Sequence, residues 1–312
     1  MKTPRTAPSS PSAAETFYRP PAGPSNAMPD LSALEQTLRR IAPGGYFALA
    51  FSGGLDSRFL AHAAHALGFH VRLFHISGPH IAGSETEHAA SWAEKRGFPF
   101  TRIELDPLGI PLVSSGDKKR CYACKRMLFS RLLEISGRPL CDGSNASDGD
   151  SYRPGAQAAR ELGVLSPLAM AGLAKADIRN LAAQTGMDEP DQLPRPCLLT
   201  RLPYGMSPER RILHGLEQGE QAVRNLLFLA GFKNVDFRLR LVSPAKLELH
   251  FMQQHIMNIP DDVLSALSGA VATAAPGLPP ASVVTVERLS GYYDRPEFQP
   301  AAQTCSSLPQ GD

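Results

Sequence analysis

The segment from Tyr46 to Gly68 constrains the fold of this chain more than any other. An apolar run, Tyr46 to Phe51, predicts a buried strand, and an alanine-rich run, Phe59 to Leu67, predicts a helix. Between them stands a glycine-rich turn, Ser52-Gly53-Gly54-Leu55-Asp56-Ser57. Such a turn directs several backbone N–H groups into one concavity, and the helix dipole adds positive potential there. The segment therefore predicts a phosphate site at the end of a strand.

Each residue of this turn has an expected role. Gly53 and Gly54 allow close backbone approach because they have no Cβ, and Ser52 and Ser57 add hydroxyl donors. Asp56 alone would repel phosphate, so we interpret it as a Mg²⁺ ligand. The turn lacks the lysine of a Walker A loop. It resembles the SGGxDS signature of the PP-loop ATP pyrophosphatases, and that resemblance implies that ATP is bound and attacked at its α-phosphorus.

Composition excludes some classes of function. The 312 residues include 32 basic and 30 acidic side chains, a net charge of +2. The chain thus lacks the overall excess of positive charge that is typical of proteins that bind nucleic acid or an anionic membrane. No stretch approaches the roughly 20 apolar residues of a membrane span. Five cysteines are an odd number in a chain too large to need disulfides. We therefore expect a cytoplasmic protein whose cysteines are core residues, ligands or nucleophiles.

The pattern of elements predicts an α/β fold. After the turn, strands and helices alternate, which indicates a doubly wound parallel sheet with ligands beyond the carboxyl ends of its strands. We place this domain at residues 29–187, after a Pro-, Ser- and Ala-rich tail at 1–28 that is expected to be disordered. The expected strands are 70–77, 100–105, 139–142 and 164–167, and the expected helices are 31–41, 84–96 with Ser84 as N-cap, 121–135 and 175–184.

A second, smaller α+β domain is expected at residues 207–295. A proline-rich stretch, 188–206, precedes it and is interpreted as a linker that doubles as an active-site loop. Residues 296–312 form a polar tail that is expected to be disordered. The expected elements of this domain are a helix capped by Ser207-Pro208 and running to about 230, strands 235–241 and 246–251, a helix 261–274 and a strand 282–289.

Cys121 and Cys124 form a C-x-x-C at a predicted helix start, a position that favours thiolate. Zinc would need four ligands, and no second ligand pair is present. A thioredoxin-type redox pair would need that fold. A third thiol, with Cys197 of the proline-rich loop as the candidate, would suit a [4Fe–4S] cluster with one open iron. The motif alone leaves the cluster, zinc and an ordinary core or solvated pair open.

Two further groups of polar residues are candidates for binding. The turn from Asp142 to Asp148 follows a predicted strand and offers Asp142 and Asn145 to Mg²⁺ and ribose, although an ordinary Asx turn would look the same. Arg201, Arg238 and Arg240 suit phosphate. Arg238 and Arg240 share one strand face because they are two residues apart, and a solvated face is the alternative.

Six segments together point to a family. Taken in order, they resemble the ATP-dependent sulfur transferase that builds the nickel-pincer cofactor of lactate racemase, over about residues 30–292. That resemblance implies adenylation of a carboxylate of a pyridinium dicarboxylate mononucleotide, followed by replacement of an oxygen with sulfur. It also implies a sulfide source and a homo-oligomer. The segments are 51–57 (FSGGLDS), 121–125 (CYACK), 142–148 (DGSNASD), 152–155 (YRPG), 166–168 (SPL) and 197–205 (CLLTRLPYG).

The resemblance also assigns residues. Cys197 matches a loop cysteine that some members sacrifice as the sulfur donor, and Cys121 and Cys124 match the extra pair of members that hold a cluster. Arg201, Arg238 and Arg240 match basic residues that hold phosphate. Three departures are Ser144 and Ser147 in the asparagine turn and Pro196 before Cys197. The alternatives are the sacrificial-cysteine form of the reaction, a PP-loop tRNA thiolase and a non-catalytic nucleotide-binding scaffold.

Overall fold

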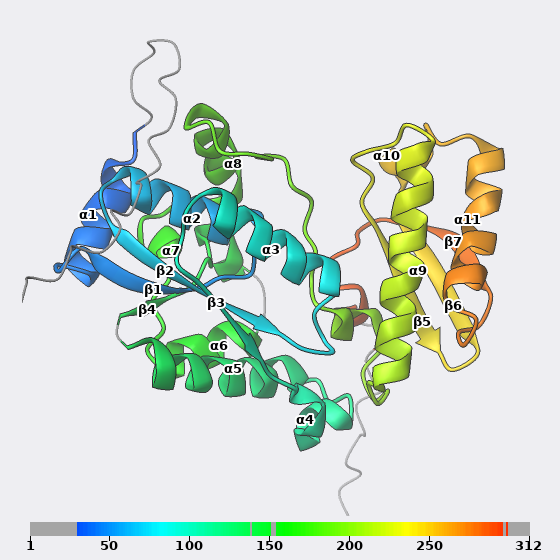
Figure 1. The fold of residues 1–312 in the computed structure, drawn as a ribbon. Coiled ribbons are helices and arrows are strands. Elements are labelled where there is room, and N and C mark those ends of the chain that lie inside the picture. The colour runs from blue at the N-terminus through cyan, green and yellow to red at the C-terminus, as the bar shows by residue number, and fades with distance from the viewer. Residues whose placement is uncertain (1–29, 138, 151–153, 296–297, 299–312) are drawn as a thin grey trace, which may run out of the picture.

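The computed structural model describes residues 30–137, 139–150, 154–295 and 298. The predicted tail 1–28 lies outside this range, as does the tail 296–312 apart from Phe298. The first part of the chain forms a four-stranded parallel sheet in the order β3-β2-β1-β4 (Figure 1). Its strands are β1 (Tyr46–Ala50), β2 (His70–Ser77), β3 (Phe100–Glu104) and β4 (Leu140–Cys141).

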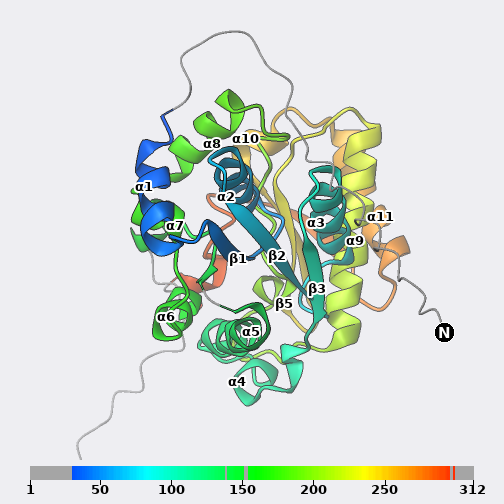
Figure 2. The same ribbon diagram turned by 60° about the vertical axis from the view of Figure 1, so that its left-hand side comes forward.

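Both faces of this sheet are covered by helices, which makes it doubly wound (Figure 2). In β1, Phe47 and Leu49 pack on one side against α1, α2, α3 and α8, whereas Ala48 packs on the other against α5 and α6. A strand buried on both faces is apolar throughout, as this one is. The helices are α1 (Ser32–Ile41), α2 (Leu55–Ala66), α3 (Gly83–Lys95), α4 (Pro111–Ser114), α5 (Arg120–Ser136), α6 (Pro154–Glu161), α7 (Pro167–Met170) and α8 (Lys175–Gln184).

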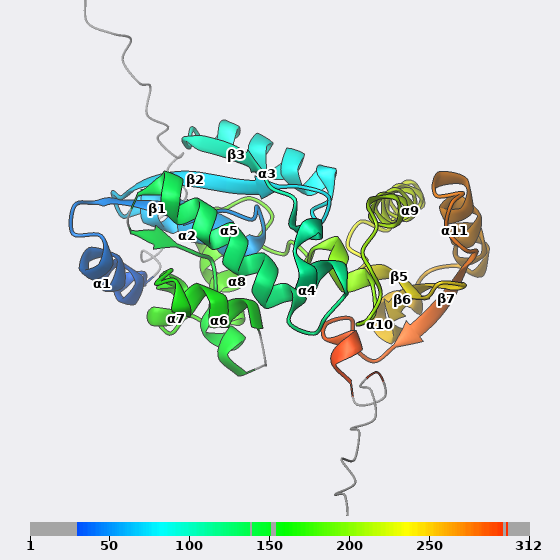
Figure 3. The ribbon, with the colours of Figure 1, turned by 90° about the horizontal axis from the view of Figure 1, so that it is seen from below.

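The second part of the chain forms a smaller mixed sheet in the order β5-β6-β7 (Figure 3). Strand β6 pairs antiparallel with β5 and parallel with β7. Helices α9 and α11 pack side by side against leucines of the sheet, such as Leu239 and Leu249. The α/β fold with a second α+β part is thus confirmed. The elements are α9 (Arg210–Leu229), β5 (Phe237–Ser243), β6 (Lys246–Met252), α10 (Gln253–Ile256), α11 (Asp261–Ala274) and β7 (Ala281–Val286), and the 3₁₀ turns of the chain are Pro107–Gly109, Ala146–Asp150, Leu198–Arg201 and Tyr292–Asp294.

Several elements differ from the sequence prediction, and three of the differences have a local cause. The strand expected at 164–167 is a single bridge between Cys141 and Leu165, because Pro167 already begins α7. Ser84 does not cap α3. The helix begins at Gly83, whose N–H donates to Glu217 Oε1 of α9 at 2.6 Å, so an acceptor from α9 replaces a local cap. Helix α9 begins at Arg210, after Ser207-Pro208.

Among the described residues, no helix is both long enough and apolar enough to cross a membrane.

Candidate active site

The glycine-rich turn lies where β1 ends and α2 begins, at the carboxyl edge of the sheet. Gly53 has a φ of +77°, and a Cβ there would come within 2.7 Å of the Ala89 Cβ in α3. Gly54 differs, because its φ of −75° and ψ of 166° suit any residue, and a Cβ would stand 3.4 Å from Ser52 Oγ. The turn therefore requires glycine at 53 for its own conformation, and at 54 only if a ligand comes close.

Hydroxyl groups brace this turn from inside. The Gly54 N–H donates to Ser52 Oγ at 3.3 Å, and Ser52 Oγ lies 3.1 Å from Ser57 Oγ. Ser57 Oγ donates to the Gly54 carbonyl at 3.0 Å. These bonds fix the conformation of the turn.

Asp56 links the turn to two other segments. Its Oδ1 is 2.6 Å from Lys175 Nζ, and its Oδ2 accepts a hydrogen bond from Asn145 Nδ2 at 3.3 Å. The sequence analysis did not select Lys175. It is the first residue of α8, where a positive charge is unfavourable because it opposes the helix dipole. This unfavourable position could have marked Lys175 as a candidate site residue. The carboxylate of Asp56 and the ammonium of Lys175 thus lie together at the glycine-rich turn, Ser52 to Ser57, which is called the phosphate turn below.

The turn that begins at Asp142 packs directly on the phosphate turn. A Cβ at Gly143 would come within 2.9 Å of the Ser57 nitrogen. The Asp142 carboxylate accepts hydrogen bonds from Ser144 N–H at 3.0 Å, Ser144 Oγ at 2.9 Å and Ser166 Oγ at 2.7 Å. Asp142 therefore shapes the turn, whereas Asn145 faces Asp56. Nucleotide binding by either residue remains a prediction.

The three cysteines selected from the sequence converge from two distant segments. Cys121 and Cys124 are the second and fifth residues of α5, and Cys197 directly precedes the 3₁₀ turn Leu198–Arg201. Burial raises the pKa of Cys121 to about 11 and that of Cys124 to about 12, and for both the next cause is the negative charge of Cys197. Burial thus acts against the thiolate expected at a helix start, and the three thiols lie close enough to repel one another when ionised.

All four described cysteines are free, and Cys141 is apart from this group, in β4. Over the described ranges, no three His, Cys, Asp or Glu side chains are arranged to hold a single metal ion. A cluster has a different requirement, because each thiolate binds its own iron and the sulfurs need not share one coordination sphere. Whether the three thiols hold a cluster therefore stays a prediction.

The three arginines selected from the sequence are buried rather than solvated. Arg201 forms a bidentate pair with Glu220, at 2.6 and 3.0 Å, and donates to the Pro196 carbonyl at 3.3 Å. Arg238 pairs with Asp236 and donates to the Pro194 carbonyl at 2.7 Å. These contacts hold the segment that leads to Cys197.

Arg240 completes the group. Its Nη1 lies 2.8 Å from His250 Nδ1, and its Nη2 donates to the Leu289 carbonyl. Burial lowers the pKa of Arg240 to about 10, and the neighbouring charge of Arg201 is the next cause. Arg238 and Arg240 are 5% and 3% exposed, so the alternative of a solvated strand face is wrong. The three guanidinium groups influence one another electrostatically, and Arg201 and Arg238 each have a carboxylate partner. Phosphate binding by these residues remains a prediction.

No family model matches the chain. The pyridinium-3,5-bisthiocarboxylic acid mononucleotide synthase of Lactiplantibacillus plantarum is 30% identical over 186 residues, which are 58% of this chain and 67% of that protein. This chain belongs to the family of that synthase.

Two further relatives of this synthase family are uncharacterized proteins. One, from Synechocystis sp., is 33% identical over 162 residues, 50% of this chain and 60% of its own length. The other, from Methanocaldococcus jannaschii, is 28% identical over 183 residues, 57% of this chain and 69% of its own length. The match thus spans less than two thirds of the Synechocystis protein and slightly more than two thirds of the other two.

In this member of the synthase family, the linker is fixed to the phosphate domain by arginine. Arg58, fully buried in the first turn of α2, donates to the carbonyls of Asp188 and Glu189 and to Gln192 Oε1, at 3.1, 3.2 and 2.8 Å. Further along, the Leu198 N–H donates to the His80 carbonyl at 2.9 Å. The helix that follows the glycine-rich turn thus holds the start of the loop that carries Cys197.

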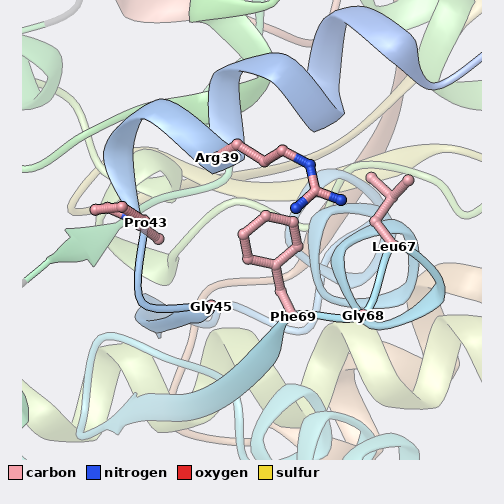
Figure 4. A pocket seen from close by; sticks show the side chains of 7 residues that line it. Arg39, Pro43, Gly45, Leu67, Gly68 and Phe69 are labelled. Atoms are coloured by element: carbon pink, nitrogen blue, oxygen red, sulfur yellow. The ribbon is translucent and has the colours of Figure 1, made fainter.

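A separate pocket of about 290 Å³ lies at the opposite end of the sheet (Figure 4). Gly45 and Phe69, in its wall, directly precede β1 and β2, whereas the phosphate turn follows β1. Arg39 reaches over the Phe69 ring, 6.0 Å from its centroid. The length of β1 therefore separates this pocket from the candidate site.

Proposed function

We propose that this protein is an ATP-dependent, AMP-forming sulfur transferase. It adenylates a carboxylate of a pyridinium dicarboxylate mononucleotide and converts that carboxylate to a thiocarboxylate for a nickel-pincer cofactor. One observation carries the proposal: the thiols of Cys121, Cys124 and Cys197 converge in a chain that also has the phosphate turn. The name of the Lactiplantibacillus relative supplies the substrate class.

The first step creates a leaving group. A carboxylate oxygen attacks the α-phosphorus of ATP, the bond from that phosphorus to the bridging oxygen breaks, and pyrophosphate departs. The N–H groups of the turn and the Lys175 ammonium are suited to the phosphate oxygens. Asp56 is proposed as a Mg²⁺ ligand because Mg²⁺ needs few protein carboxylates beside phosphate. Its oxygens contact Lys175 Nζ and Asn145 Nδ2, and Lys175 would turn to phosphate when the ligand binds.

The second step replaces oxygen with sulfur. Sulfide attacks the acyl carbon, the carbon–oxygen bond to the adenylate breaks, and AMP leaves with the bonding electrons. Cys121, Cys124 and Cys197 would hold a [4Fe–4S] cluster, which when bound would supply sulfide in deprotonated form. Cys124 is buried and Cys121 and Cys197 are half-buried, which would limit the access of water to the acyl adenylate.

The arginine group has a complementary role in this proposal. Arg201, Arg238 and Arg240 come from the loop and from β5, and they would hold the phosphate of the mononucleotide. Because Arg201 and Arg238 also hold the carbonyls of Pro196 and Pro194, substrate binding would organise the loop that carries Cys197.

The proposal is tested by separating adenylation from sulfur transfer. Protein purified and reconstituted without oxygen is assayed for pyrophosphate release, for iron and for thiocarboxylate. We expect Asp56→Ala to lose pyrophosphate release. We expect Cys121→Ser, Cys124→Ser and Cys197→Ser each to keep it but to lose iron and sulfur transfer. Cys141→Ser, which changes a cysteine inside β4, is the matched control and should retain all three.

Two results would redirect the proposal. Full sulfur transfer by Cys121→Ser, together with loss of one H₂S from the mass of the wild-type protein per turnover, would indicate a sacrificial Cys197. Salt-dependent binding of tRNA, without pyrophosphate release on the pyridinium substrate, would indicate a tRNA thiolase. A cytoplasmic location and a homo-oligomer remain predictions.

A further inference from the structure

One face of the second sheet is both charged and buried. Strands β5 and β6 pair so that Arg238 lies opposite His250 and Arg240 lies opposite Glu248. All four share a face because their spacing along each strand is two, and they are 5%, 0%, 3% and 6% exposed, in that order. Burying charged groups costs free energy unless they are paired, so such a face is a candidate for function rather than stability.

The contacts on this face determine which nitrogen of His250 carries its proton. Arg240 Nη1 is 2.8 Å from His250 Nδ1, and His250 Nε2 is 2.6 Å from Glu248 Oε2. A guanidinium can only donate, so Nδ1 accepts; Nε2 therefore bears the hydrogen and donates to the carboxylate. The ring is neutral in this arrangement. Its pKa is lowered to about 4, mainly by burial, which agrees with a neutral ring.

Arg240 also contacts an aromatic ring and a backbone carbonyl. Its guanidinium lies 4.7 Å from the centroid of the Tyr292 ring, and its Nη2 donates to the Leu289 carbonyl. Glu248 is itself fixed, since its Oε1 is 2.6 Å from Lys246 Nζ. Within the described part of the chain, Arg240 Nε has no hydrogen-bond partner, so one N–H remains for a ligand.

We propose that His250 is a positioning residue for the substrate phosphate, which it serves by orienting Arg240. The inference rests on the proposed function, in which Arg240 binds that phosphate. A carboxylate in direct contact with Arg240 would also orient it but would neutralise much of its charge. A neutral imidazole fixes the direction of the guanidinium and keeps Glu248 one side chain away, so the positive charge remains available to an anion.

The test compares a pyridinium dicarboxylate mononucleotide with its dephosphorylated nucleoside, by calorimetry on the full-length protein. The Kd of the nucleoside divided by the Kd of the nucleotide measures how much the phosphate contributes to affinity. We expect His250→Phe to reduce that ratio about tenfold, the value of one charge-assisted hydrogen bond, and to leave nucleoside affinity unchanged. His250→Asn places an amide oxygen near Nδ1 and should restore part of the ratio. His214→Gln, on the exposed side of α9, is the control and should match the wild type.

The variants distinguish the inference from the function on which it rests. A reduced ratio in Arg240→Leu with an unchanged ratio in His250→Phe would overturn the role of His250 but not the phosphate site. An unchanged ratio in Arg240→Leu would overturn the phosphate role of Arg240 and the inference with it. Equal weakening of nucleotide and nucleoside by both His250 variants would assign His250 to folding alone and would also overturn the inference.

Discussion

At the scale of single residues, the two glycines of the phosphate turn are not equivalent. Gly53 has a positive φ and faces the backbone and Cβ of Ala89, whereas Gly54 has an ordinary extended conformation. We expect Gly53→Ala to lower the free energy of unfolding by about 1–3 kcal/mol, and Gly54→Ala to leave it within about 0.5 kcal/mol. Urea denaturation of both variants measures this difference.

The Gly53→Ala and Gly54→Ala variants also distinguish an effect on stability from an effect on ATP binding. If Gly54 serves a ligand, Gly54→Ala should weaken ATP binding while the protein remains as stable as the wild type. Unchanged ATP affinity in that variant would mean that only Gly53 is required by the turn.

At the scale of elements, the regular strands and helices could be predicted because their patterns are local. The helix at 261–274 matches α11, and the turn between β1 and α2 stands where the sequence placed it. What could not be predicted depends on long-range contacts. The first turn of α3 is satisfied by Glu217 from α9, and Lys175 meets Asp56 only because α8 returns to the phosphate turn. No local pattern specifies such pairs.

The linker is the element whose behaviour the sequence described least well. It was expected to be irregular because of its prolines, and it forms neither an α-helix nor a strand. The sequence did not show that Arg58 holds it at the carbonyls of Asp188 and Glu189. We expect Arg58→Met to release this end of the loop. Pyrophosphate release should persist, whereas sulfur transfer should fall by about tenfold or more, since Cys197 would be less well placed. Pyrophosphate and thiocarboxylate measured in the same reaction would show this uncoupling.

A structural role alone would give a different result. General damage to α2 by Arg58→Met should reduce pyrophosphate release and sulfur transfer together, and that outcome would contradict a positioning role for Arg58. The control is Arg72→Met on β2, an exposed arginine that contacts Thr101 and not the linker.

At the scale of the whole molecule, apolar residues of α4 and α5 join the core of the second sheet near the loop of Cys197. His80 lies beside this loop, since its carbonyl accepts a hydrogen bond from the Leu198 N–H. It is 2% exposed, and within the described residues neither ring nitrogen has a hydrogen-bond partner. Burial lowers the pKa of His80 to about 4, while Asp106 acts in the opposite direction. The folded protein therefore keeps this ring neutral at pH values where the unfolded chain protonates it.

The sign of the resulting pH dependence follows from proton binding. Between about pH 6.5 and pH 4 the unfolded chain binds the additional proton, so the free energy of unfolding should fall as the pH is lowered, by up to about 1.4 kcal/mol per pH unit. His80→Phe removes the titrating group and replaces an unpaired buried ring with an apolar one, so its stability should depend less steeply on pH. Urea denaturation at several pH values would measure both slopes. The same slope in wild type and His80→Phe would show that protonation of other groups, such as the similarly buried His250, accounts for the acid sensitivity of the fold.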